Sequence, residues 1–383
     1  MKKNFGTKLI IIVFTAFIAI LGLLYAFMPK RDFSETEKRY LAQAPKLTFD
    51  SLKEGTFSKD FETFLADQTP LRSAFVGINA YFELLKGNNG SNGVYLGKDG
   101  MLIEKPLARD NRLETNIDRI VDFSKKQTVP VSLVAVPSKG YICSDKLPEN
   151  AQEYLDGEYN KTIENMVYGK LKFVDVTSEF LNSSDKNEYY YKTDHHWTSK
   201  GAFAGYEAIS KYLNWPLISS FAYKLPSKDD YKIETYDGFY GTSYAKSCYT
   251  LTKPDNVELW LNKKTLGKAK VTITEGEKVT GNDNMFFKNH LTDSDKYLTF
   301  LDGNHSLVKI ETGNEGGRLL LIKDSFAHSI APFLAENYSE IIMIDLRYYG
   351  AAVKNLIADE GITEIMFLYS IENLATSMDI YFD

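Results

Sequence analysis

The sequence predicts an α/β protein: a parallel sheet flanked by helices, with a β-rich insertion and an N-terminal transmembrane helix. Three observations predict it. Apolar, β-branched runs alternate with segments of helical periodicity in residues 111–214 and 316–383, a pattern typical of buried parallel strands joined by helices. Short runs of alternating polarity separate these two parts. A long charge-free run stands near the N-terminus.

Composition limits the classes of protein that the chain can belong to. Its 383 residues suffice for one large domain or two ordinary ones, and the net charge of −6 argues against a nucleic-acid partner. The 25 Tyr, 24 Phe and 3 Trp fit either an aromatic core or a sugar-binding surface. The two cysteines, Cys143 and Cys248, form no C-x-x-C motif, so one disulfide and two free thiols both stay open.

The charge-free run covers residues 9–28. A helix of that length spans the roughly 30 Å hydrocarbon core of a bilayer. Lysines precede it, and no clear cleavage site follows. We therefore expect a cytoplasmic tail and an uncleaved, single-pass signal anchor over residues 1–31, with the rest of the chain on the extracytoplasmic side of the cell membrane. Basic residues also follow the run, so the positive-inside rule alone is nearly balanced.

Residues 32–110 are expected to form a helical segment and a hairpin that pack on the body. Aromatic residues with helical spacing predict two helices, which Pro70 separates. The Gly- and Asn-rich stretch from residue 87 to residue 100 predicts a hairpin around the strand at 94–96.

Residues 111–214 are predicted to form the first part of the α/β domain. Its apolar runs predict buried strands at 129–136 and 171–176. The helices are predicted from amphipathic spacing, and they begin near residue 113, at residue 156 and at residue 199.

Residues 215–315 have short alternating runs between turn signals, so this segment is predicted to be the β-rich insertion. Residues 316–383 are predicted to form the C-terminal part of the α/β domain. Its strands are expected at 318–322, 341–346 and 364–369, and its helices at 326–337 and 351–359.

The stretch Thr193-Asp-His-His-Trp-Thr198 holds two of the five histidines of the chain side by side. A carboxylate two residues before a histidine can accept its ring N–H, which makes Asp194 and His196 a candidate orienter and base. A helix-capping loop with a structural aspartate is the plainer alternative. Asp194, His195 and His196 could also offer three metal ligands, but no second ligand cluster is evident, and we expect no metal.

Ser325 is the candidate nucleophile. It follows the apolar strand predicted at 318–322 and precedes a helix, so it should lie at the sheet edge where open α/β sheets bind ligands. Free backbone N–H groups at the start of the helix could help to stabilise an oxyanion. A simple N-cap role for Ser325 is equally open, and His328, at i+3, is a rival base. No G-x-S-x-G motif surrounds Ser325.

Taken together, Asp194-His-His-Trp197 and Lys323-Asp-Ser-Phe326 resemble the DHHW protein family, which is related to the SGNH-like alginate O-acetyltransferases of the bacterial envelope. The resemblance covers most of the chain beyond the anchor and implies an SGNH-hydrolase-like fold. Weaker supporting stretches are residues 37–41, 67–72, 94–100 and 239–244.

The resemblance implies a triad in which Asp194 orients, His196 acts as base and Ser325 is the nucleophile. His195 takes the variable middle position, and a lysine, Lys323, stands where a glycine often precedes Asp-Ser. Other residues are expected to form the oxyanion and substrate wall: Gly241, Thr242, His195, Trp197, Arg347 and Tyr348. For Arg347 and Tyr348 an ordinary surface ion pair stays an equal alternative.

By the same resemblance we expect a serine-dependent O-acetyltransferase that modifies a cell-surface polysaccharide or exopolysaccharide. Its acetyl donor would be supplied by a membrane-bound O-acyltransferase, and no cofactor is expected. A carbohydrate esterase of the same fold and a non-catalytic envelope protein that binds glycan or a partner are the alternatives.

Overall fold

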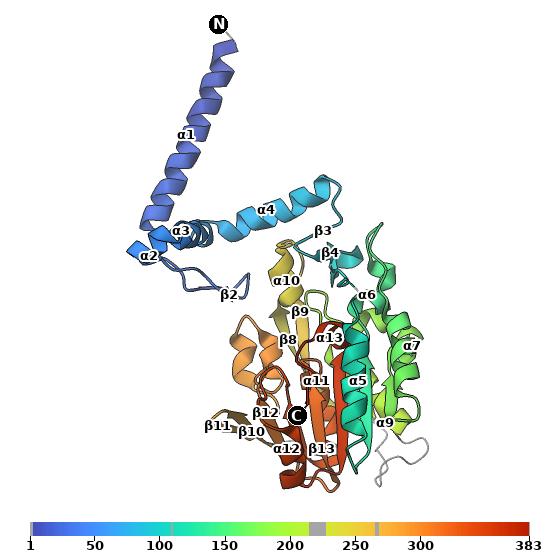
Figure 1. Cartoon of the computed structure of the whole chain (residues 1–383). Coiled ribbons are helices and arrows are strands. Elements are labelled where there is room, and N and C mark those ends of the chain that lie inside the picture. Colours follow the sequence, from blue (N-terminus) through green and yellow to red (C-terminus); the bar gives the residue numbers. More distant parts are fainter. Residues whose placement is uncertain (1–2, 109, 214–226, 265–267, 383) are drawn as a thin grey trace. The chain divides into compact units, whose positions relative to one another are not determined.

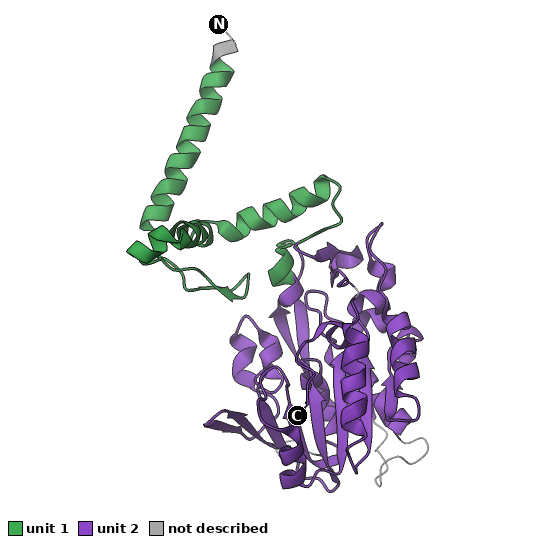
Figure 2. Cartoon of the chain, in the orientation of Figure 1, with its two compact units in different colours: residues 1–91, 244–251 green, residues 92–243, 252–383 purple. Residues whose placement is uncertain are grey.

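The computed structural model describes residues 3–108, 110–213, 227–264 and 268–382. Residues 215–226, which begin the predicted insertion, lie outside the described residues. The chain divides into two compact units (Figure 2): residues 1–91 with 244–251, and residues 92–243 with 252–383. We call them the N-terminal unit and the main unit.

The N-terminal unit begins with α1 (Lys3–Phe27). Within the described part of the chain, its segment Phe5–Phe27 is the one helix long and apolar enough to cross a membrane. This helix qualifies as a membrane span by its length and composition, the same two features from which the sequence predicted it.

The other elements of this unit are short. The strands β1 (Phe33–Ser34) and β2 (Arg39–Tyr40) form a small antiparallel pair. The two predicted helices are α3 (Thr56–Asp67) and α4 (Arg72–Leu85), and the helix break lies around Pro70 as expected. The remaining elements are α2 (Phe49–Lys53), β3 (Gly90–Ser91) and most of α10 (Thr242–Ser247). Helix α10 begins in the main unit, and its residues from 244 onward belong to the N-terminal unit.

The main unit contains an eight-stranded sheet among the described residues, in the order β11-β10-β12-β14-β13-β15-β6-β7. Figure 1 shows this sheet with helices packed beside it. The five strands from β14 to β7 are parallel. They are β6 (Val131–Val136), β7 (Lys172–Asp175), β13 (Gly317–Lys323), β14 (Tyr338–Ile344) and β15 (Glu364–Ser370). The predicted α/β fold with a core of parallel strands is therefore confirmed.

The insertion makes the sheet mixed rather than wholly parallel. Its strands β10 (Lys270–Glu275), β11 (Lys278–Asn282) and β12 (Leu307–Glu311) continue the sheet antiparallel, next to β14. Strands β10 and β11 are joined by a tight turn in which Gly276 has φ +60°, and strands connected so closely can pair only antiparallel. The strands β8 (Tyr231–Phe239) and β9 (Asp255–Asn262) form a separate antiparallel ribbon.

Helices cover both faces of the sheet because successive strand residues point to opposite sides. Leu319 and Leu321 of β13 pack in one core with α9 (Ser199–Leu213) and α11 (Ala327–Leu334). On the other face, Ile322 and its neighbours pack in a second core with α5 (Arg112–Ser124), α7 (Asp156–Val167), α12 (Val353–Glu360) and α13 (Ile371–Thr376).

Four short elements complete the main unit near the carboxyl ends of the parallel strands. They are β4 (Val94–Leu96), β5 (Leu102–Glu104), α6 (Lys139–Ile142) and α8 (Thr177–Leu181). Both cysteines are buried and free, so of the two alternatives left open by the sequence the structure has two thiols.

Candidate active site

The stretch Thr193–Thr198 forms a tight loop closed by backbone hydrogen bonds. Tyr190 and Trp197 make an isolated β-bridge, and the N–H of Thr198 donates to the carbonyl of Tyr189 at 2.8 Å. The hydroxyl of Thr198 then accepts the N–H of Gly201 at 3.2 Å and so caps the start of α9. The tyrosines at 189–191 thus form one side of this loop rather than a strand of the sheet.

Asp194 is buried inside the loop and accepts four hydrogen bonds. Its Oδ1 accepts the backbone N–H of His196 at 2.9 Å and the ring Nδ1–H of His196 at 2.6 Å. Its Oδ2 accepts the backbone N–H of Thr242 at 2.6 Å and the Thr242 hydroxyl at 3.0 Å. Burial alone would raise the pKa of Asp194, but His196, His195 and these hydrogen bonds hold the pKa well below its usual value.

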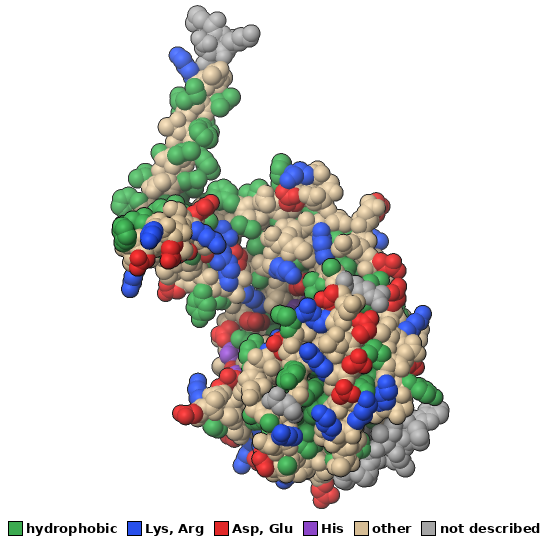
Figure 3. All heavy atoms as spheres, in the orientation of Figure 1, with side chains coloured by type: hydrophobic (Ala, Val, Ile, Leu, Met, Phe, Trp, Pro, Cys, Tyr) green, Lys and Arg blue, Asp and Glu red, His purple; other side chains and the backbone are tan. Residues whose placement is uncertain are grey.

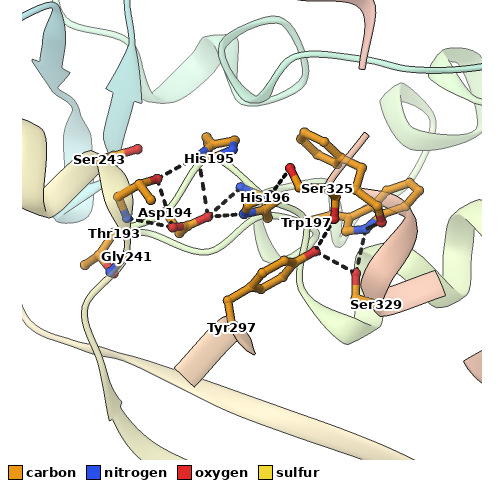
Figure 4. A network of polar contacts seen from close by, with 12 residues as sticks. Thr193, Asp194, His195, His196, Trp197, Gly241, Ser243, Tyr297, Ser325 and Ser329 are labelled. Atoms are coloured by element: carbon orange, nitrogen blue, oxygen red, sulfur yellow. Dashed lines mark hydrogen bonds and ion pairs between the residues drawn. The ribbon is translucent and has the colours of Figure 1, made fainter. Parts of the chain in front are cut away.

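The other ring nitrogen of His196, Nε2, lies 2.7 Å from Ser325 Oγ (Figure 4). The carboxylate, the imidazole and the hydroxyl therefore form one continuous hydrogen-bonded line, although Ser325 follows His196 by more than a hundred residues. The hydroxyl of Ser325 bonds to His196 and does not cap α11, whose N-cap is Phe326.

The turn that carries Ser325 is fixed by the aspartate before it. Asp324 Oδ1 accepts the N–H of Phe326 at 3.0 Å, and Oδ2 accepts the N–H of Ser370 and the amide of Asn373, each at 2.7 Å. This carboxylate is thus fully used in joining β13 to the end of β15. Among the described residues, the backbone N–H of Ser325 meets no hydrogen-bond acceptor, and Ser325 is itself half-buried.

Tyr297 packs on this line, although nothing in the sequence pointed to it. Its ring stacks on the His196 ring with centroids 4.0 Å apart and planes inclined by 10°. Its hydroxyl donates to the carbonyl of Ser325 at 3.1 Å and lies 3.3 Å from Ser329 Oγ. Burial raises the pKa of Tyr297 well above its usual value, so the hydroxyl stays neutral. One side chain thus contacts both the imidazole and the turn of the serine.

Trp197 does not face a substrate, contrary to expectation. It is fully buried, and its indole N–H donates to the carbonyl of Phe326 at 3.0 Å and to Ser329 Oγ at 2.8 Å. A large ring with one donor is held in the core when a polar partner lies within reach, and α11 provides two. Trp197 therefore ties the histidine loop to the helix that follows Ser325.

Gly241 and Thr242, the expected oxyanion wall, instead enclose Asp194. A Cβ at position 241 would lie 2.1 Å from the Cβ of Asp194, so only glycine fits here. The N–H of Gly241 donates to Thr193 Oγ1 at 3.0 Å, and that of Thr242 donates to Asp194. Neither N–H is left to meet an oxyanion, because both are already used to hold the loop.

His195 differs from its neighbour in having a partly exposed ring. Its Nδ1 lies 2.7 Å from Thr242 Oγ1, and its ring is 3.9 Å from the ring of His196. Ligand atoms of Asp194, His195 and His196 lie within 4.8 Å of one another, close enough for a metal ion. A cation would have to displace the hydrogen bonds of Asp194 and His196 described above.

Beneath the loop lies a buried lysine that the sequence analysis missed. The ammonium of Lys139 donates to the carbonyls of Leu102, Lys192 and Asp194 at 2.5, 3.0 and 3.0 Å. Burial lowers the pKa of Lys139 to about 8. A lysine directly after the buried strand β6 was the only sign of this role in the sequence.

His328, the rival base, points away from Ser325. Its Nε2 lies 2.7 Å from the ammonium of Lys323, which also reaches Asp345 Oδ2 at 3.2 Å. Burial first, and Lys323 second, lower the pKa of His328 well below its usual value. His328 therefore accepts a hydrogen bond from Lys323 and has no path to the serine proton.

Arg347 and Tyr348 extend this second cluster towards solvent. The Arg347 guanidinium pairs with both carboxylate oxygens of Asp345, with Nε 2.8 Å from Oδ1, and reaches Asn304 Oδ1 at 3.2 Å. The exposed ring of Tyr348 lies 5.4 Å from the guanidinium. The ion-pair alternative left open for Arg347 is thus present in the structure.

Comparisons with known proteins confirm the predicted SGNH-like fold. Residues 98–223 match the family model of the SGNH hydrolase-like domain of the acetyltransferase AlgX. The structure of Bacillus cereus PatB1 with a sulfonyl adduct aligns with a TM-score of 0.66 at 24% identity, covering 76% of this chain and 98% of that one. A DHHW family protein from Eubacterium siraeum aligns with a TM-score of 0.61 at 23% identity, covering 75% and 93%.

No curated protein is significantly similar to the chain in sequence. The resemblance inferred from the two motifs is nevertheless confirmed, since both the AlgX-type domain and a DHHW family protein are among the matches. The solved structures share the fold, and the family model supports an O-acyltransferase or esterase role.

Proposed function

We propose that this chain is a membrane-anchored, extracytoplasmic O-acetyltransferase that modifies a polysaccharide through Ser325, His196 and Asp194. One observation carries the proposal: the continuous line of hydrogen bonds from Asp194 Oδ1 through the His196 ring to Ser325 Oγ, with steps of 2.6 and 2.7 Å. A serine becomes a nucleophile when a base can take its proton and a carboxylate orients that base. The match to an acetyltransferase domain supports the choice of acyl group.

In the first half-reaction, Ser325 Oγ attacks the carbonyl carbon of an acetyl ester while His196 Nε2 accepts the hydroxyl proton. The tetrahedral intermediate collapses, the bond to the donor oxygen breaks, and His196 returns the proton to that oxygen. Acetyl-serine remains. Asp194 keeps Nδ1 protonated and stabilises the imidazolium that forms transiently.

In the second half-reaction, a sugar hydroxyl takes the place of the donor. His196 Nε2 removes its proton as the hydroxyl oxygen attacks the acetyl carbon. The intermediate then collapses with breakage of the bond between the acetyl carbon and Ser325 Oγ, and His196 returns the proton to Ser325 Oγ, which leaves the sugar ester and free Ser325. Since the N–H groups of Gly241 and Thr242 are occupied, we assign the developing oxyanion to the backbone N–H of Ser325, which is without a partner among the described residues.

The anchor and the donor complete the proposal. Helix α1 would hold the main unit at the outer face of the cell membrane. A membrane-bound O-acyltransferase would supply acetyl groups there, and an envelope polysaccharide would accept them. The family model, whose description names the acetyltransferase AlgX, supports acetyl transfer as the reaction.

Hydrolysis of a chromogenic acetyl ester by the full chain in detergent tests the triad. We expect turnover from the wild type, and loss of on the order of 10⁴-fold or more for Ser325→Ala and His196→Ala. Ser184→Ala, a change at an exposed serine, is the matched control and should behave as wild type. Equal rates in all four proteins would remove the triad and leave the non-catalytic alternative.

An arylsulfonyl fluoride gives an independent readout. It should add one sulfonyl group to Ser325 in the wild type, detected by peptide mass spectrometry, and none in Ser325→Ala. The sulfonyl adduct in the PatB1 structure motivates the reagent. Modification spread over other residues would argue against an activated serine at position 325.

An acetylesterase is the second candidate, because Ser325 is half-buried rather than sealed from solvent. Water could then take the place of the sugar hydroxyl. Mass spectrometry of reactions with an oligosaccharide acceptor separates the two activities. An acetylated oligosaccharide indicates transfer, whereas acetate without acetylated sugar indicates an esterase.

A further inference from the structure

Two stretches singled out by the family resemblance, residues 37–41 and 67–72, lie in the N-terminal unit and take no part in the Ser325 site. They form an ion-pair network. The guanidinium of Arg39 grips both carboxylate oxygens of Asp67, at 2.9 and 2.6 Å, and its Nε contacts Glu37 at 3.0 Å. Arg72 pairs with the same Glu37 at 2.8 Å. Such planar, two-pronged contacts fix orientation as well as distance, so the corner between α3 and α4 is rigidly joined to the β1–β2 pair.

The same corner is tied to the exit of α1. The side chain of Gln68 accepts the backbone N–H of Arg31 at 3.0 Å and donates to the carbonyls of Arg31 and Ala42 at 2.8 and 3.0 Å. Just before Arg31, the ammonium of Lys30 lies 3.5 Å from the centre of the Tyr25 ring. The corner is therefore held within a few residues of the point where the apolar helix ends.

Helix α4 has two unlike faces. Its inner face is made of small residues, Gly77 and Ala80, which are buried; a Cβ at position 77 would lie 2.8 Å from the side chain of Thr250 in the same unit. Its outer face carries four large apolar side chains at i, i+3, i+7 and i+10, all of them exposed: Phe75, Ile78, Phe82 and Leu85. That spacing places them on one side of the helix.

The segment before α4 adds to this apolar surface. Figure 3 shows hydrophobic side chains gathered along α1 and beside its end at α2 and α3. Five large ones are exposed there: Leu47, Phe49, Leu52, Phe61 and Leu65. Soluble proteins rarely leave so many large apolar side chains uncovered in one region, so this surface needs a cover.

We propose that α3 and α4 form an arm that lies in the surface of the bilayer crossed by α1, with the outer face of α4 in contact with lipid. The proposal rests on the membrane anchor of the proposed function. An amphipathic helix of this kind inserts its apolar side roughly 5–10 Å into the boundary between headgroups and acyl chains. The ion pairs of Arg39 and Arg72 with Asp67 and Glu37 would hold the arm at the depth of the headgroups.

Lipid is the occupant that the contacts favour. Phe75 on the outer face of α4 meets Phe17 of α1 edge-on, with ring centroids 6.5 Å apart, so the two apolar surfaces are continuous. Helix α1 is itself uncovered along its apolar length. Tyr25 and Lys30 are residue types that settle at the headgroup level, which marks where the span ends.

Lipid quenching of single labels on the full chain tests the arm. Cysteines at Ile78 or Phe82 carry an environment-sensitive dye, and the protein is reconstituted in phosphatidylcholine–phosphatidylglycerol vesicles that contain nitroxide lipids. Ile18→Cys reports insertion of α1, and Lys125→Cys, on an exposed part of α5, is the aqueous control. The unaltered chain, whose two cysteines are buried, gives the background.

We expect the labels at 78 and 82 to lose most of their fluorescence to a nitroxide near the headgroups, the label at 18 to a nitroxide near the chain ends, and the label at 125 to neither. Labels at 78 and 82 that behave like the label at 125, while 18 is quenched, would overturn the arm and leave the anchor standing. A blue-shifted but unquenched label at 78 means that protein covers the face, which also overturns the proposal. Absence of quenching at 18 as well removes the anchor and with it the arm.

Discussion

Asp194 and Asp67 are two buried carboxylates with similar burial and similar hydrogen bonding. Their exposed fractions are 1% and 4%, and each accepts several hydrogen bonds from backbone and side chain. Each is also held ionised: the pKa of Asp194 is well below its usual value, and Arg39 lowers the pKa of Asp67 to about 2.

The difference lies in the partner. Arg39 is charged at every pH that the protein meets, so its pairing with Asp67 is a fixed joint. The imidazole of His196 is a group that can accept a proton and return it, and its second nitrogen meets the hydroxyl of Ser325. A buried aspartate therefore reveals little by itself. Whether it serves structure or chemistry depends on whether its partner can release a proton and on what lies beyond that partner.

The largest expected effect is on Asp194→Asn, which keeps the shape of the side chain but replaces one acceptor by an NH₂ group. That group would face either the ring N–H of His196 or the donors of Thr242, so the histidine loses its orientation. We expect kcat for a chromogenic acetyl ester to fall by roughly 10²–10⁴-fold. A rate within tenfold of wild type, in a protein of unchanged thermal stability, would show that Asp194 is structural, like Asp67.

The second prediction concerns Lys139, whose buried ammonium supports the loop that carries Asp194. It tests whether this loop depends on a buried cation. Its pKa is about 8 when folded and 10.5 when unfolded, so between these values the unfolded chain binds more protons and stability rises with pH. The wild type should gain up to roughly 3 kcal/mol of unfolding free energy from pH 8 to 10.5 relative to Lys139→Met. Urea unfolding of both proteins at several pH values measures it, and parallel profiles would contradict it.

Asp67→Asn should be the reverse of Asp194→Asn. Ester hydrolysis stays at the wild-type rate, because the triad lies in the other unit. The N-terminal unit becomes less stable by roughly 2 kcal/mol at neutral pH, a contribution that the wild type has fully above about pH 4 and loses as pH falls through about 2. Hydrogen exchange in α3 and α4 reads out the loss. Diminished turnover with unchanged exchange would break the contrast between the two aspartates.

Tyr297 should give the smallest effect, because it supports the histidine without taking part in proton transfer. Tyr297→Phe keeps the ring stacked on His196 and removes only the hydroxyl contacts, so we expect kcat to fall less than about tenfold. Tyr297→Leu also removes the stack and should cost more. Equal rates for the two variants would show that stacking is unimportant.

The sequence predicted those parts of the site whose geometry is local. The two-residue spacing of Asp194 and His196 suffices to bring the carboxylate to the ring, and a strand followed directly by a helix places Ser325 at the sheet edge. The parallel strands were predictable because burial on both faces leaves nearly continuous apolar runs.

The remainder depends on contacts between distant segments. Tyr297 comes from a short 3₁₀ helix of the insertion, Lys296–Thr299, which is too short to show a periodicity, and only the fold brings it to His196. Trp197 was assigned to the substrate wall because it adjoins two histidines, yet packing against α11 turns it inward. The same limit applies to the sheet, since alternating strands could not reveal that β12 pairs with β14.

Strand β13, which leads to Ser325, lies between β14 and β15, and both follow it in the chain. Its terminal turn is completed only when Ser370 and Asn373 bind Asp324. A chain still being synthesised therefore has its histidine loop long before it has a fixed nucleophile. The order of assembly therefore decides when the site is completed: the turn that holds Ser325 beside His196 forms only once the last strand is in place, so an unfinished polypeptide lacks this contact.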